Sequence, residues 1–462
     1  MAAPKAGSFI EEKNMKKLVV VMIFAAVVAV WCMAAVVVEK QGVAAPVTVQ
    51  PVLALYNQGL SLLKAGKKEE ALVAFNRAID GGMNMTEPDA RAIVASSADN
   101  AGGILMMQGK LEEAEAMFKK ALAANPRHAL ALNNLGVVYL KQGRVDLAMT
   151  QFKASLTTDP KLSLPYQNLA EALMAVGNLK LAAQYLSTAM QVAPADHQTL
   201  ILLARVYEYA GNREMEEKTW KTLVQTTGNS PRSKLQLGTF YMRTGAPTKA
   251  RPLFQEVMKA NPKLLDARLQ MVRLELLQGK ADAAEAGFRA LLKEFPDESV
   301  VRCDLAALLI QKGRLDEAEA LAAEGAKRQP REAGNWFVLG RCQEKAGRLK
   351  EAERSYFEAV SLDRQQAEAW NNLGILVAGR NDAKAALKCF FSAFFADPYN
   401  TEIRYNLGRT LVITKTDHEK GVRLVMAAAK GKGPAAQKAR QFIVDLEKIA
   451  AGGDPGWGGT KP

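Results

Sequence analysis

Asparagines that recur at one fixed spacing are the side chains in this sequence most suited to chemistry. ALNNLG occupies residues 131–136 and AWNNLG occupies residues 369–374, and Asn133 and Asn371 lie 238 residues apart, which is seven times 34. A carboxamide offers one acceptor and two donors, so it matches a peptide group whatever side chain that group carries. The chemistry indicated is the capture of a polypeptide backbone.

The second asparagine of each pair belongs to a longer row. At the sixth residue of the repeating unit described below, six of eleven units carry Asn and two carry Gln. We expect this row to contact an extended peptide, with Asn134 and Asn372 as the main contacts. The alternative is a position that simply tolerates a polar residue facing water. The members of the row are Asn57, Asn100, Asn134, Asn168, Gln236, Gln270, Asn372 and Asn406.

Arginines form a second row, at the ninth residue of every second unit from the fifth onward. A planar guanidinium fork favours carboxylates or phosphates, so these residues are candidates for binding an anionic ligand. The alternative is pairing with neighbouring glutamates inside the molecule. The ninth-residue members are Arg205, Arg273, Arg341 and Arg409, and the thirteenth residue of other units adds Lys64, Lys141, Arg243 and Lys345.

No catalytic or metal-binding pattern accompanies these rows. The sequence contains no H-E-x-x-H, G-x-S-x-G or G-x-x-x-x-G-K-[ST] motif, and its four cysteines form no C-x-x-C pair. The three histidines, His128, His197 and His418, fall at unit junctions or in a turn. Acidic pairs such as Glu112 and Glu113 stand early in predicted helices, where they favour the helix dipole. We therefore predict no enzymatic activity, no cofactor and no metal.

The elements that position both rows repeat every 34 residues from residue 95. Prolines lie on one 34-residue lattice between residues 126 and 398, and glycines lie on another between 109 and 347. A small residue followed four residues later by an aromatic, such as Ala148 and Phe152, forms a third. This pattern predicts a helix, a tight glycine turn, a second helix and a break. One such hairpin cannot bury its own apolar face, so neighbouring hairpins must stack.

These residues resemble the tetratricopeptide repeat, whose pattern is W-x2-L-G-x2-Y, then A-x3-F, then P. The segment WNNLGILV…AALKCF…ADP (370–398) follows it apart from Val377, and LNNLGVVY…LAMTQF…TDP (132–160) follows it with Leu132 in place of Trp. The resemblance covers roughly four fifths of the chain and implies first helices that line an inner groove. In superhelical members of the family, asparagines at the sixth position hold a peptide backbone. Function does not follow from this fold alone.

The predicted fold class is all-α, a right-handed solenoid of about eleven helix-turn-helix repeats in residues 52–434. A nine-residue insertion around Gly81–Pro88 is expected to form a loop, and residues 435–451 are expected to form an amphipathic capping helix. Residues 452–462 have no core-forming pattern. The fifth, seventh and eighth units depart most from the pattern, through Glu216, Val272 and Ala322. The units start at 52, 95, 129, 163, 197, 231, 265, 299, 333, 367 and 401.

A stretch of 21 residues without a charge, 18–38, precedes the repeats and is long enough to cross a bilayer as a helix. Lysines in residues 1–17 predict a cytoplasmic N-terminus, a single pass through the inner membrane, and repeats on the periplasmic side. The alternative is a cleaved signal peptide that begins at Met15. Residues 39–51 are expected to form an extended tether.

The formal net charge of +13 is concentrated in two zones. Residues 231–264 carry seven basic and one acidic side chain, and residues 401–462 carry eleven basic and six acidic ones. Nucleic acid is a poor partner outside the cytoplasm, whereas acidic peptides, acidic polysaccharide or anionic lipid head groups suit such zones. The function we predict is a membrane-anchored scaffold that binds proteins of an envelope complex. The alternatives are a binder of acidic polysaccharide in an export system and a self-assembling homo-oligomer.

Overall fold

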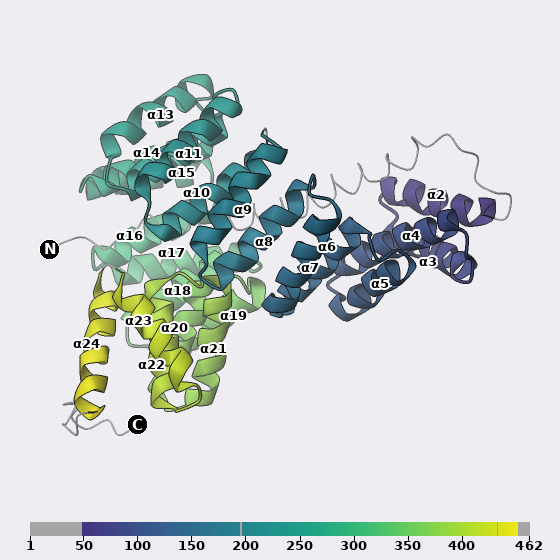
Figure 1. Cartoon of the computed structure of the whole chain (residues 1–462). Helices are drawn as coiled ribbons and strands as arrows, with labels where there is room; N and C mark the ends of the chain where they lie inside the picture. The colour runs from purple at the N-terminus through teal and green to yellow at the C-terminus, as the bar shows by residue number, and fades with distance from the viewer. Residues whose placement is uncertain (1–48, 195, 432, 451–462) are drawn as a thin grey trace. The chain divides into compact units, whose positions relative to one another are not determined.

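The computed structural model describes residues 49–194, 196–431 and 433–450, and these residues form 23 helices and no strand. Figure 1 labels the helices α2 to α24. The described residues divide into two compact units, one that ends at Leu237 and one that begins at Gly238, so the boundary falls inside α12 (Pro231–Arg243). The two units are described separately.

In the first unit, helices alternate between the first and the second helix of each repeat. The first helices are α2 (Gln50–Lys64), α4 (Pro88–Met107), α6 (Ala129–Lys141), α8 (Ser163–Ala175) and α10 (His197–Ala210). The second helices are α3 (Lys68–Gly82), α5 (Leu111–Ala124), α7 (Val145–Thr158), α9 (Leu179–Val192) and α11 (Arg213–Thr226).

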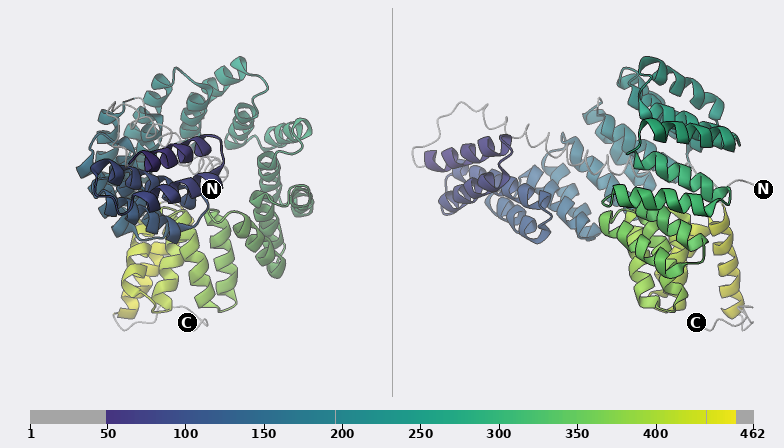
Figure 2. Two further views of the ribbon diagram at one scale, coloured as in Figure 1. Left: turned by 90° about the vertical axis from the view of Figure 1, so that its right-hand side faces the viewer. Right: turned by 180° about the vertical axis from the view of Figure 1, so that it is seen from behind.

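The second unit continues the alternation, and its helices stack one upon the next in both views of Figure 2. Its first helices are α14 (Leu265–Leu277), α16 (Ser299–Gln311), α18 (Ala333–Lys345), α20 (Ala367–Gly379) and α22 (Thr401–Ile413). Its second helices are α13 (Pro247–Ala260), α15 (Ala281–Glu294), α17 (Leu315–Arg328), α19 (Leu349–Leu362), α21 (Ala383–Ala396) and α23 (His418–Ala429), and α24 (Pro434–Ala450) follows them.

The turn inside each hairpin uses a left-handed backbone. Gly143 has a φ of 76° and Gly313 a φ of 77°, a region that residues with a Cβ rarely adopt. In the tenth and eleventh repeats the same position is held by Asn381, with φ 63°, and Lys415, with φ 54°. The repeats therefore preserve the turn geometry even where they lose the glycine.

In six of the eleven repeats the two helices meet where an aromatic ring lies against a glycine. A Cβ at Gly136 would lie 2.5 Å from Cε1 of Phe152, and one at Gly374 would lie 2.6 Å from Cε1 of Phe390. Ala148, one turn before Phe152, is completely buried. These contacts confirm the predicted close approach of the two helices, in which the aromatic ring fills the space between them.

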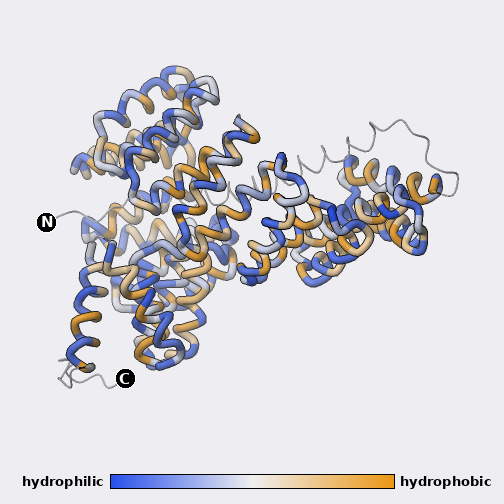
Figure 3. The backbone as a smooth tube through the Cα atoms, in the orientation of Figure 1, coloured by the Kyte–Doolittle hydropathy of each residue, from blue (hydrophilic) through white to orange (hydrophobic). Residues whose placement is uncertain are grey.

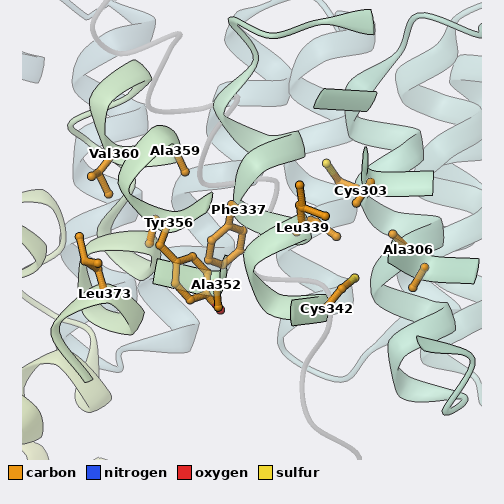
Figure 4. Packing of buried hydrophobic residues seen from close by; sticks show 14 of the residues in the cluster. Cys303, Ala306, Phe337, Leu339, Cys342, Ala352, Tyr356, Ala359, Val360 and Leu373 are labelled. Carbon is orange, nitrogen blue, oxygen red and sulfur yellow. The ribbon is translucent and has the colours of Figure 1, made fainter. Parts of the chain in front are cut away.

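The ninth repeat shows the same core in more detail (Figure 4). Tyr356 and Ala352 from α19 face Phe337 from α18, and the two rings lie 5.9 Å apart between centroids. All three side chains are buried. The colours of Figure 3 show apolar and polar residues interspersed along the helices.

The three departures noted in the sequence are compensated locally. Val272 replaces the usual glycine, and Gly287 on α15 makes room for it, because a Cβ at Gly287 would lie 2.7 Å from Cγ2 of Val272. Glu216 replaces the usual small residue, is 1% exposed, and accepts a 3.2 Å hydrogen bond from Nε1 of Trp220.

In the eighth repeat Ala322 stands where most other repeats have an aromatic. There a different long side chain is buried: Arg302 is 2% exposed, donates to the carbonyl of Pro296, and packs against Gly325. A missing ring is thus accompanied by a buried arginine whose donors are satisfied.

The ends of the repeat array differ in detail from the prediction. Helix α2 begins at Gln50, inside the segment predicted as a tether, and α4 begins at Pro88, so only residues 83–87 of the predicted insertion lie between helices. Helix α24 packs on α22 and α23 through Ala439 and Phe442. These buried contacts cover the end of the last hairpin.

The predicted segments 1–17, 18–38 and 452–462 lie outside the described residues, as does most of 39–51. Within residues 49–450, apart from the two gaps, no helix combines the length and the apolar character needed to cross a membrane.

The contact between Gly136 and Phe152 predicts a steric penalty. Gly136→Ala forces the ring or the helices to shift and should lower the free energy of unfolding by about 1–3 kcal/mol. Gly379→Ala is the matched control, because nothing lies within 4 Å of a Cβ at Gly379. Urea unfolding followed by circular dichroism measures both, and equal stability of the two variants would contradict the packing account.

Candidate functional site

The predicted asparagine row forms hydrogen bonds between successive repeats. Nδ2 of Asn168 on α8 donates to Oδ1 of Asn133 on α6 at 2.8 Å. Nδ2 of Asn134 on α6 donates to Oδ1 of Asp99 on α4 at 2.9 Å. In both cases the sixth residue of one repeat donates to the fifth residue of the repeat before it.

These bonds join into a buried chain. Nδ2 of Asn133 lies 3.4 Å from Oδ1 of Asn134, which connects the two inter-repeat bonds within α6. The four side chains are between 1% and 8% exposed. Burial raises the pKa of the Asp99 carboxyl, while His128 and the amide of Asn134 oppose that rise. The twin asparagines of the first NNLG segment therefore link three successive first helices.

The second NNLG segment repeats the arrangement in the other unit. Nδ2 of Asn406 on α22 donates to Oδ1 of Asn371 on α20 at 2.9 Å. Asn372 differs, because Nδ2 donates to the hydroxyl of Tyr356 at 3.3 Å. Phe337, the fifth residue of the preceding repeat, offers no acceptor at this position.

The other predicted members are less uniform. Nδ2 of Asn100 donates to the carbonyl of Ser96 at 2.8 Å. Asn57 is exposed, Gln236 is half-buried, and Gln270 is buried. The row is therefore not a continuous line of carboxamides open to a ligand.

The fifth-position partners Asp99, Asn133 and Asn371 were not among the predicted site residues, although they accept the hydrogen bonds between repeats. Their signal was present as a pairing rule: an Asp or Asn at position five of one repeat is followed by Asn at position six of the next. Asp99 with Asn134 satisfies this rule, as do the other two pairs. Spacing alone could not show that side chains 35 residues apart in sequence touch.

One arginine of the predicted row, Arg273, also forms an ion pair within the protein. Nε of Arg273 donates to Oδ2 of Asp304 at 2.7 Å, and the two side chains are 8% and 9% exposed. Burial raises the pKa of Asp304, and Arg273 counteracts the rise. Arg273 therefore forms an intramolecular ion pair, which was the alternative to ligand binding. Its partner is an aspartate rather than a glutamate.

The remaining arginines have different surroundings. The guanidinium of Arg341 lies 5.9 Å from the ring centroid of Phe337, and that of Arg243 lies 5.8 Å from the ring of Phe240. Arg409 is exposed. Arg205 belongs to a group of charged side chains drawn from three first helices.

That group comprises Lys141 on α6, Glu171 on α8 and Arg205 on α10, and we call it the charged cluster. Burial raises the pKa of Glu171, while the positive charges of Arg205 and Lys141 lower it. The pKa of Arg205 is itself raised, because Tyr209 and Glu171 more than offset the effect of burial. Glu171 and Arg205 remain half-buried, so part of each side chain is accessible.

The charged cluster has the chemistry of a binding surface. An arginine fork donates to a carboxylate, and a carboxylate beside it accepts from amide or ammonium donors. Among the described residues no group of three or more His, Cys, Asp or Glu side chains is arranged to hold a metal ion. The arrangement offers recognition of polar groups on three adjacent helices.

A stack of helical hairpins with a 34-residue period defines the class as an α-helical repeat protein. Family profiles described as tetratricopeptide repeat match residues 53–80, 102–163, 241–300, 275–336 and 333–366. These matches support the tetratricopeptide repeat family for this chain, as its motifs predicted. Proteins with this fold generally serve as scaffolds for protein–protein interactions.

Solved structures similar to this chain include a tetratricopeptide repeat protein from Parabacteroides merdae, with 19% identity over 61% of this chain and 98% of that one, at a TM-score of 0.39. Yeast Tom70 has 14% identity over 87% of this chain and 98% of that one, at 0.44. PilF from Pseudomonas aeruginosa has 20% identity over 49% and 99%, at 0.38. With TM-scores below 0.5, nothing about their partners is carried over. Among curated protein sequences, none matches this chain.

The inter-repeat hydrogen bonds predict a stabilising role for the asparagine row. Asn168→Ala leaves the buried oxygen of Asn133 without its donor and should lower the free energy of unfolding by about 1–2 kcal/mol. A double-mutant cycle with Asn133→Ala should give a coupling energy of at least about 0.5 kcal/mol. Asn57→Ala, at the same repeat position but exposed, serves as the control and should change stability by less than about 0.5 kcal/mol. A coupling energy of zero would show that the hydrogen bond between Asn168 and Asn133 does not contribute to stability.

Proposed function

We propose that this chain is a non-catalytic scaffold that binds extended segments of partner proteins along its first helices. The observation that carries the proposal is the charged cluster, in which the half-buried Glu171 on α8 lies within the influence of the positive charges of Lys141 on α6 and Arg205 on α10. The general use of tetratricopeptide folds as interaction scaffolds supports it.

The cluster favours a segment that carries both a carboxylate and a donor. Arg205 would hold the carboxylate through its fork, and Glu171 would accept an ammonium or amide from the segment. Because burial raises the pKa of Glu171, a cation from the partner would restore charge compensation that the protein supplies only in part. The asparagines Asn134 and Asn168 would act behind this surface, by holding α4, α6 and α8 in register.

Binding of acidic polysaccharide receives less support than binding of protein segments. The predicted arginine row would need several accessible guanidinium groups, and Arg273 is held in a buried ion pair with Asp304. Residues 18–38 and their flanking lysines motivate the further proposal that the scaffold is anchored in the inner membrane and serves an envelope complex.

A peptide array tests the binding proposal. The full chain, held in lipid nanodiscs, is applied to extended peptides that contain acidic, basic, mixed or neutral residues, and the dissociation constant of the best binder is measured by fluorescence anisotropy. Arg205→Ala should weaken that binder about tenfold to a hundredfold, because it removes a charged hydrogen bond.

Arg409→Ala is the matched control, since Arg409 holds the same repeat position but is exposed and lies in the other unit. It should leave the dissociation constant unchanged. Equal affinity of the wild-type chain and the Arg205→Ala variant would reject the charged cluster as the contact.

A further inference from the structure

One row of the second helices changes character abruptly near the C-terminal end. At position 25 of the repeat, the second to eighth repeats carry exposed residues that are polar or small. The last three repeats carry large apolar residues there instead. The earlier members are Lys119, Lys153, Ser187, Lys221, Gln255, Arg289 and Ala323, and the later ones are Phe357, Phe391 and Met426, the last shifted by the one-residue insertion near Thr416.

The apolar members are held on the outside of the molecule. Phe357 on α19 is 58% exposed, Met426 on α23 is 51% exposed, and Phe391 on α21 is half-buried. One turn beyond Phe391 on the same helix, Phe395 is 70% exposed. We call these four residues the outer apolar patch, and the three helices that carry it are labelled in Figure 1.

Basic side chains precede the patch on the same helices. Lys350 and Arg354 lie one to two turns before Phe357, and Lys384 and Lys388 hold the same positions on α21. All four are exposed, and none forms an ion pair within the described part of the chain. These positions, 18 and 22 of the repeat, share a helix face with position 25 because they are spaced by four and three residues.

A cation also lies directly against the patch. Nζ of Lys420 is 4.9 Å from the ring centroid of Phe391. The acidic residues of α19 are partly engaged elsewhere, since Glu353 pairs with Arg380 and Glu351 with Arg348. The face therefore combines projecting apolar side chains with basic groups that have no acidic partner.

We propose that this face of α19, α21 and α23 binds the surface of an anionic lipid bilayer. Phe357, Phe395 and Met426 would enter the boundary between head groups and acyl chains, and the lysines would extend to lipid phosphates. Each basic side chain near an anionic surface adds attraction that salt screens. This inference does not depend on the proposed peptide-binding role of the first helices.

The form of the patch favours a bilayer over an acidic partner protein. Its four side chains project from three helices, two of them from α21, and a protein partner would need shaped pockets to receive them. A lipid interface surrounds projecting side chains without such pockets. The same row is polar or small in the preceding repeats. The repeat pattern itself therefore does not require apolar residues at this position.

Vesicle sedimentation tests the proposal on the full chain. The chain is held in nanodiscs of phosphatidylcholine, so that residues 18–38 are already placed in lipid, and is mixed with vesicles of phosphatidylcholine alone or with about a third phosphatidylglycerol. The wild-type chain should sediment with the anionic vesicles, less so at high salt, and not with the neutral ones. The double variant Phe357→Ser with Phe395→Ser should lose binding by at least about tenfold.

A second variant separates the charge from the apolar contribution. Lys384→Gln with Lys388→Gln should weaken binding to anionic vesicles and remove much of its salt dependence. Lys153→Ser with Lys221→Ser changes the same row where it is polar and should have no effect. All of these positions are exposed, so unchanged circular dichroism and thermal unfolding confirm that the variants fold.

Two outcomes would overturn the proposal. One is failure of the wild-type chain to sediment with anionic vesicles. The other is equal sedimentation of the wild-type chain and the double phenylalanine variant. In the first case, binding of a synthetic acidic amphipathic peptide would assign the face to an acidic protein segment.

Discussion

Six of the eleven hairpins depend on one close contact, in which an aromatic ring of the second helix lies against a glycine of the first helix. Where Gly136 meets Phe152, the helices approach so closely that even a methyl group would clash. That approach orients the second helix and thereby decides which of its faces reaches the next repeat. Where Val272 replaces the glycine, Phe288 keeps the aromatic position and is buried, and the neighbouring Gly287 makes room for the valine side chain.

Stacking of the hairpins uses a second, polar interaction. Asparagine amides at position six bond to side chains at position five of the preceding repeat, which fixes the first helices against one another. A buried amide without a partner is costly, so a satisfied pair also disfavours other registers. The first helices thereby form a fixed support, and the charged cluster at positions nine and thirteen stands upon it.

Much of this was readable from the sequence. The 34-residue period, the hairpins, and the match of small and aromatic residues follow from local chemistry that repeats, and the helices of the structure bear them out. The role of the asparagines was harder to read. A position that recurs can serve a ligand, the solvent or the next repeat, and only the arrangement in space distinguishes them. Glu171 escaped notice for a similar reason, since its importance comes from Lys141 and Arg205 on neighbouring helices.

Two faces of the repeats thus have separate chemistry. The first helices present charges that are partly buried and partly compensated, whereas the last second helices present apolar side chains beside basic ones. A scaffold benefits from such separation, because one face can hold a partner while the other meets a different surface.

The central claim is that partner segments bind along the first helices of residues 129–210. Hydrogen–deuterium exchange of the full chain, with and without a peptide selected from the array, tests it most directly, because binding slows local opening. The account predicts slower exchange in α6, α8 and α10, with α7 and α9 unchanged. Slower exchange confined to α7 and α9 would contradict it.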